Sequence, residues 1–157
     1  MAMVSDRLVG GMMFHQDNAD LNEFLGMHGF AKLHEHGFLD DSKSLRKVHR
    51  KTILHLGRIP PQGDQKRGNI LSKVMAYQSS DLGANDRYRL AVTSLESWME
   101  WERETAKVFG EASESLDGTL WRLVTKLQRG AEAEHAEAHR LLIEAKACDL
   151  AHLYEMQ

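Results

Sequence analysis

Several features are scarce in this sequence, and each absence narrows the class of protein. Cys148 is the only cysteine in 157 residues, so no disulfide forms within the chain, and a reducing, cytoplasmic setting is expected. No run of about 18 apolar residues occurs, so we expect no membrane-spanning helix and no membrane partner. The two prolines, Pro60 and Pro61, are adjacent, and they divide the chain into an N-terminal and a C-terminal half.

Nucleophilic and phosphate-binding motifs are also missing. Cys148 lies near the C-terminal end of the last expected helix, where the helix dipole disfavours a thiolate nucleophile. Gly10-Gly11 lacks the flanking residues of a phosphate-binding loop. The net charge is −3, and nothing in this balance indicates a nucleic-acid partner.

The composition that remains suits one globular domain. Hydrophobic residues make up 42% and charged residues 27% of the chain, and the length allows a substantial core. Nine histidines are many for this length, so their positions are important for the functional argument.

Apolar residues recur at helical spacing in four segments. These expected helices cover residues 18–36, 42–56, 87–115 and 119–154. Gly37 is expected to end the first in the left-handed conformation, and Gly57 followed by Pro60 to end the second. No alternating pattern of useful length predicts a strand.

The segments outside these helices complete the predicted organisation. Residues 1–16 are expected to form an N-terminal arm, and residues 61–84 a crossover that includes a short helix over residues 70–78. The whole chain, 1–157, is then a single all-α domain, an up-down four-helix bundle with a long middle crossover.

Ionisable residues fall inside the apolar stripes of the two long C-terminal helices. Glu102 lies within the stripe of Leu95, Trp98 and Phe109, where an unpaired carboxylate costs several kcal/mol unless it binds a cation. His135 lies within the last helix's stripe. Glu132 lies on one flank of it, next to Gln128 and His139. Glu134 and Glu137 lie on the other flank and are expected to be solvated.

The two shorter helices carry inward histidines. His28 is in line with Leu21 and Leu25, and His49 is in line with Leu45 and Val48. Carboxylates and imidazoles that converge in a bundle suit iron, manganese or zinc. The predicted metal ligands are Glu102, Glu132, His135, His28 and His49.

The C-terminal half, residues 85–157, resembles the last two helices of the ferritin-like superfamily. There the third helix carries a glutamate seven residues before an aromatic residue, which corresponds to Glu102 and Phe109 here. The fourth helix carries Glu-x-x-His, which corresponds to Glu132 and His135. The resemblance implies a ferritin-like bundle with a metal site, iron above all, that reacts with oxygen or peroxide or stores the metal.

The N-terminal half departs from the superfamily pattern. Leu21-Asn22 leads to His28 at the position where the first helix of the superfamily has a glutamate. The second helix has His49 and His55 but no glutamate, although its exit, Leu56-Gly57-Arg58-Ile59-Pro60, resembles the Gly-x-Pro exits of the superfamily. These departures favour a mononuclear site, or zinc, over a standard di-iron centre.

Two other interpretations remain open at this point. One is a non-catalytic helical module that dimerises through its long helices and uses the inward polar groups as hydrogen-bonded pairs. The other is a bundle that holds one metal with three histidines, His28, His49 and His135. A homo-oligomer, a dimer or larger, is expected because the shorter helix pair cannot cover the longer one.

Overall fold

The computed structural model describes residues 1–58 and 82–156, and every regular element in this part of the chain is a helix. Four long helices and one short one follow each other in the chain. They are α1 (Ala2–Phe24), α2 (His28–Leu56), α4 (Ala84–Ser113), α5 (Gly118–Lys146) and α6 (Leu150–Glu155). The predicted all-α four-helix bundle is confirmed.

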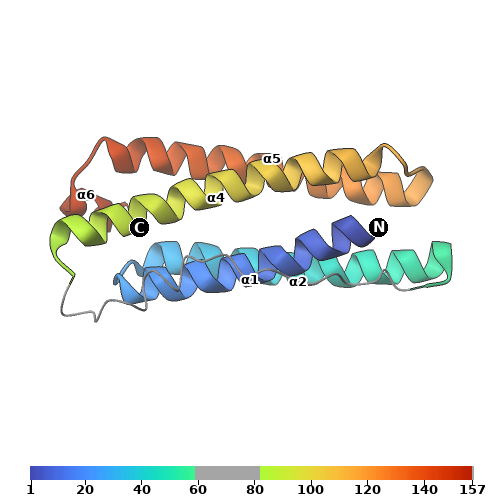
Figure 1. The fold of residues 1–157 in the computed structure, drawn as a ribbon, viewed down its shortest axis with the longest axis horizontal. Helices are drawn as coiled ribbons and strands as arrows, with labels where there is room; N and C mark the ends of the chain where they lie inside the picture. Colours follow the sequence, from blue (N-terminus) through green and yellow to red (C-terminus); the bar gives the residue numbers. More distant parts are fainter. Residues whose placement is uncertain (59–81, 157) are drawn as a thin grey trace.

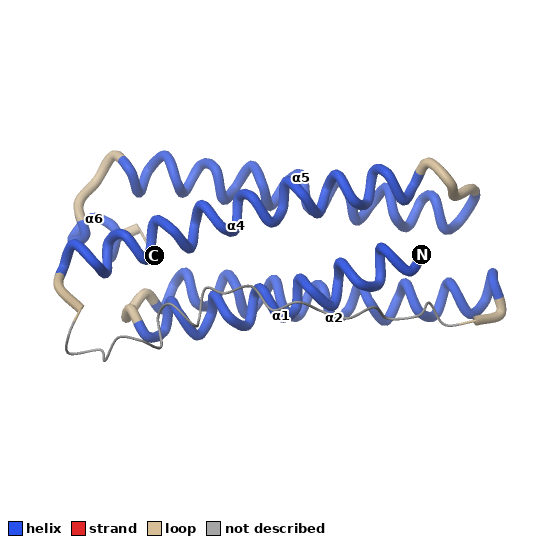
Figure 2. Tube along the Cα trace, in the orientation of Figure 1, coloured by secondary structure: helices blue, strands red, loops and turns tan. Residues whose placement is uncertain are grey.

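The long helices form two antiparallel pairs that lie one on the other (Figure 1). One layer contains α1 and α2, and the other contains α4 and α5. Because α2 and α4 run in the same direction, α2 ends at the opposite end of the bundle from the start of α4 (Figure 2). The two helix ends that the connection joins therefore lie at opposite ends of the bundle. Residues 61–81 of the expected crossover, including the short helix over 70–78, lie outside the described residues.

The expectation of an N-terminal arm over residues 1–16 is wrong. These residues form most of α1, which begins at Ala2 and buries Val4 and Leu8 against the other helices. The sequence pattern does not predict this buried face. The α1 helix also buries Ser5, Asn18 and Asn22, so it has almost no amphipathic pattern.

A different glycine from the expected one separates the first two helices. Gly26 has a φ of +76°, and the backbone N–H of Met27 donates to the Asn22 carbonyl over 2.7 Å, which closes the end of α1. Gly37, the expected stop, lies within α2 instead. Gly57 ends α2 with a φ of +68°, as predicted.

The last expected helix is interrupted. The α5 helix ends at Lys146, and the Asp149 side chain accepts a hydrogen bond from the His152 backbone N–H over 3.0 Å, which starts α6. Leu153 of α6 is fully buried, and the Tyr154 hydroxyl donates to the Leu25 carbonyl over 2.8 Å. The α6 helix thus packs over the end of the bundle where α1 turns into α2.

Two apolar clusters fill the two ends of the bundle interior. One includes Leu21, Leu95 and Trp98 near the α1–α2 turn, and the other includes Val4 and Phe109 towards the α4–α5 turn. Polar side chains occupy the level between them, and this level contains the site described below. Among the described residues, no helix is both long enough and apolar enough to cross a membrane.

Candidate metal centre

A layer of polar side chains interrupts the core at mid-height of the bundle. Along α4 the order is Trp98, then Glu102 and Thr105, then Phe109. Buried polar groups at this level cost stability unless they are paired or bind a cation, so the layer is a candidate site.

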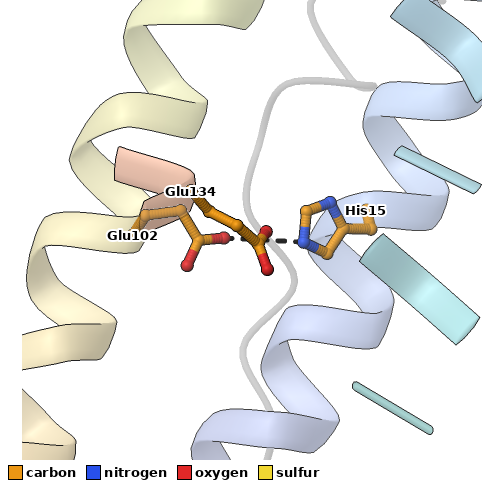
Figure 3. A group of neighbouring side chains, drawn as sticks. All are labelled: His15, Glu102 and Glu134. Carbon is orange, nitrogen blue, oxygen red and sulfur yellow. Dashed lines mark ion pairs between the residues drawn. The ribbon is translucent and has the colours of Figure 1, made fainter. Parts of the chain in front are cut away.

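Three side chains from three helices converge in this layer (Figure 3). They are His15 of α1, Glu102 of α4 and Glu134 of α5, and their ligand atoms all lie within 4.8 Å of one another. His15 Nε2 lies 3.5 Å from Glu102 Oε1. His15 and Glu102 are 2% and 4% exposed, and Glu134 is half-buried.

The spacing is close to what one bound ion requires. Ligand atoms about 2.1 Å from a shared tetrahedral ion lie about 3.4 Å from one another. His15 Nε2 and Glu102 Oε1, 3.5 Å apart, already have this spacing. Because all three ligand atoms lie within 4.8 Å of one another, the remaining distances need to shorten by at most about 1.4 Å. One imidazole nitrogen and two carboxylates form a donor set that suits iron, manganese or zinc.

The electrostatics of the triad, the group formed by His15, Glu102 and Glu134, favour a cation. Burial, and then the charge of Glu102, raise the pKa of Glu134 to about 7, whereas His15 opposes the shift. Glu134 thus ionises at a cost in free energy. A bound cation would stabilise its ionised form.

His34 of α2 orients the His15 ring. The Nδ1 atoms of the two rings lie 3.0 Å apart, so one of them donates to the other. Burial, and then the charge of His15, lower the pKa of His34 to about 3, so His34 is neutral near pH 7. When His15 Nδ1 is the donor, His15 Nε2 carries a free lone pair directed at Glu102, which is the tautomer that a metal ligand needs.

Two glycines make room for the polar layer. A Cβ at Gly37 would lie 2.5 Å from Cε1 of His15, so the His15 ring packs directly on the α2 backbone. A Cβ at Gly11 would overlap the carboxyl group of Asp41. The glycine expected to stop the first helix therefore has a packing role beside a triad member.

Asp41 and Arg7 complete the charged surroundings of the triad. Burial raises the pKa of Asp41 to about 8, helped by the charges of Glu102 and Asp40 and opposed by Arg7. The Arg7 guanidinium lies 3.6 Å from the centre of the Trp101 ring, and its Nε donates to Thr105 Oγ1 over 2.7 Å. Arg7 is thus held close to the acidic layer without joining the triad.

A cavity of about 280 Å³ adjoins the triad between α2 and α5. Glu102, Glu134 and Asp41 line its acidic end. A metal at the triad would face this cavity, so exogenous molecules could reach the open side of the ion.

Of the five predicted ligands, the structure places only Glu102 in this cluster. Glu132 is exposed and accepts a hydrogen bond from Gln128 over 3.0 Å. The Nδ1 of His135 donates to the Met99 carbonyl over 2.9 Å, because this flank of α5 faces the α4 backbone and not the bundle centre.

The two predicted N-terminal ligands also lie elsewhere. His28 is the first residue of α2, is exposed, and pairs with Glu23 over 3.0 Å. His49 is half-buried at a distant level of the bundle, where its Nε2 lies 2.9 Å from Ser5 Oγ. The three-histidine site is therefore wrong, because His28, His49 and His135 bind three different partners.

Neither His15 nor Glu134 was predicted as a metal ligand from the sequence, for two different reasons. His15 lay in the expected arm, although the spacing Val4, Leu8, Gly11, His15 is that of one helix face. Glu134 was expected to be solvated, although it is as close to the stripe of Ala131 and Ala138 as His135 is.

Searches of protein-family models, curated proteins and solved structures return no match for this chain. The functional argument therefore depends on the geometry of the site.

Proposed function

We propose that this protein is a ferritin-like metal-binding bundle that holds one divalent cation, iron above all, with His15, Glu102 and Glu134. The observation that carries the proposal is the convergence of three ligand atoms from three helices within 4.8 Å, in a polar layer between two apolar clusters. Iron bound there would supply redox chemistry toward oxygen or peroxide.

The topology supports the ferritin-like assignment. Two antiparallel helix pairs, with the second and third long helices running in the same direction, are the arrangement of ferritin-like bundles, and metal sites of that class lie in the bundle interior. The donor set has one imidazole, on α1, and no glutamate from α2. This difference supports one ion in place of two.

The residues of the site would have three roles: holding the ion, orienting a ligand and donating a proton. His15, Glu102 and Glu134 would hold the ion. His34 would fix the His15 tautomer through the Nδ1 contact. Asp41, protonated near pH 7 because of its raised pKa, would be a proton donor at the acidic end of the cavity.

Metal analysis of the untagged full-length protein tests the proposal. We expect close to one iron, manganese or zinc ion per chain after anaerobic reconstitution, and a lower melting temperature after treatment with a chelator. Less than about 0.2 ion per chain, with no change in melting, would contradict it.

A matched pair of variants assigns the ligands. The affinity for Co²⁺, used as the divalent probe ion, is measured for both variants. Glu102→Gln removes a triad carboxylate and is expected to weaken Co²⁺ binding by about 100-fold or more. Glu132→Gln makes the same chemical change on an exposed side chain and is expected to leave Co²⁺ binding unchanged. Equal affinities in the two variants would exclude this site.

The second candidate is a structural bundle without metal. It is favoured by the buried network in which Ser94 Oγ donates to Asn18 Oδ1 over 2.9 Å and Asn22 Nδ2 donates to Ser94 Oγ over 3.0 Å. In that candidate, such hydrogen-bonded pairs would fix the register of the helices. The metal analysis above distinguishes the two candidates.

A further inference from the structure

The cavity beside the triad has two chemically different ends. Glu134 and Lys126 both line it from α5, and eight residues on a helix span about 12 Å. Asp41 and Lys47 line it from α2, and six residues span about 9 Å. The cavity therefore runs from an acidic end at the triad to a basic end towards the α4–α5 turn.

The ammonium groups at the basic end are available to a ligand. Lys43 pairs with Asp40 over 3.3 Å, whereas none of the ion pairs in the described part of the chain uses Lys47 or Lys126. Residues 42–58 and 118–131 contain several lysines and arginines and no aspartate or glutamate. These two segments therefore carry a net positive charge, although the chain has a net charge of −3.

Apolar side chains line the cavity at the level of its basic end. Leu8, Phe109, Leu123 and Leu127 line the cavity from α1, α4 and α5. A free inorganic anion would leave this apolar lining in contact with water. An apolar body of a few carbon atoms would cover it and would fit a volume of about 280 Å³, which is just below the range of pockets for drug-sized ligands.

We propose that this cavity binds a small organic anion with an aliphatic body, whose charged group lies between Lys47 and Lys126 and whose body lies against Phe109 and Leu127. This proposal goes beyond metal binding, and the binding of the anion does not require the ion.

Three ligands separate the contributions of charge and apolar body. Hexanoate has both features, 1-hexanol has the body without the charge, and acetate has the charge without the body. We would measure their binding to the metal-free full-length protein by isothermal titration calorimetry in a chelating buffer. We expect hexanoate to bind with a Kd below about 1 mM, and the other two at least about tenfold more weakly.

Two double variants test the position of the charged group. Lys47→Ala with Lys126→Ala is expected to weaken hexanoate binding about tenfold or more. Lys32→Ala with Lys107→Ala removes the same charge at exposed positions outside the cavity and is expected to have no effect. Unchanged melting temperatures in the absence of ligand would show that both proteins are folded. If the first double variant is not folded, Lys47→Gln with Lys126→Gln replaces it.

The outcomes are decisive in either direction. Equal binding of hexanoate and 1-hexanol, equal binding of hexanoate and acetate, no binding up to about 10 mM, or equal losses in the two double variants would each overturn the proposal. Hexanoate binding without any metal binding would leave this proposal intact and reject the proposed metal function. Metal binding without hexanoate binding would leave the proposed metal function intact and reject the anion-binding proposal.

Discussion

The Nδ1 atoms of His15 and His34 lie 3.0 Å apart, and both side chains are almost fully buried. The contact joins α1 to α2 in the layer where His15 also approaches Glu102 of α4. Because His34 is neutral and surrounded by the rings of Phe14 and Trp98, its orientation is fixed by packing. The contact therefore fixes the direction of His15 Nε2.

Replacement of His34 tests this orientation. His34→Leu removes the partner of His15 Nδ1, and we expect the affinity for Co²⁺ to fall about 10- to 100-fold, because the ligand ring loses its orientation and tautomer. His34→Gln keeps a hydrogen-bonding group and should give an intermediate affinity. Calorimetric titration of the folded variants measures both, and a His34→Leu protein with the wild-type affinity would show that His34 does not position the ligand.

An alanine at Gly37 tests the close packing of His15 on α2. The added Cβ would lie 2.5 Å from Cε1 of the ring, so the ring must move. We expect a loss of stability of about 1–3 kcal/mol and weaker Co²⁺ binding. Gly130→Ala is the control, since nothing lies within 4 Å of its added Cβ, and it should stabilise α5 by up to about 1 kcal/mol. Urea denaturation compares the two, and equal effects would contradict the packing argument.

In the metal-free protein, the contribution of Glu134 to the free energy of unfolding should fall as the pH rises from about 4.5 to 7, whereas the lowered pKa of His34 acts in the opposite direction. The folded-state pKa of Glu134 is about 7, raised above the ordinary value of 4.5 by burial and by Glu102. A carboxyl group with a raised pKa holds its proton longer in the folded state, so its contribution is complete below pH 4.5 and is lost as the pH passes 7. Each pKa unit corresponds to about 1.4 kcal/mol, which gives about 3 kcal/mol at pH 8.

Glu134→Gln isolates this effect from the other titrating groups. The variant should match the wild type near pH 4.5 and should be more stable than the wild type at pH 8 by about 3 kcal/mol without metal. Urea denaturation in a chelating buffer measures both proteins. A constant difference between the two across this pH range would show that Glu134 is not buried beside Glu102.

Removal of the α6 anchor should affect stability without affecting the metal site. Leu153 is fully buried in the apolar cluster at the end of the bundle opposite the α4–α5 turn. We expect Leu153→Ala to cost about 2–4 kcal/mol in the free energy of unfolding and to leave Co²⁺ affinity within about twofold of the wild type. A large loss of Co²⁺ affinity would show that the two levels of the bundle are coupled.

The two flanks of α5 show where prediction from the sequence ends. Glu134 is three residues after Ala131 and four before Ala138, whereas His135 is four after Ala131 and three before Ala138. The two positions are equivalent relative to the apolar stripe. Only the packing of α5 decides between them, because one flank faces the bundle centre and the other faces the α4 backbone at Met99.

The N-terminal half shows a second limit. Gly26 and Gly37 are both plausible helix stops, and the choice depends on contacts that join residues distant in the chain. Gly37 is needed where the His15 ring packs, so it remains helical, and Gly26 provides the positive φ that ends α1. Because the first helix was expected to begin at residue 18, His15 lay in the expected arm and was not a predicted ligand.

The sequence by itself determined the all-helical class, the two long C-terminal helices, the stop at Gly57 and the inward position of Glu102. Each of these depends on local periodicity or on the conformational preference of one residue. The tertiary structure alone decided which side chains accompany Glu102. His15, His34, Asp41 and Glu134 come from three other helices, and their convergence depends on the rotation of each helix about its axis, which is set by packing between helices.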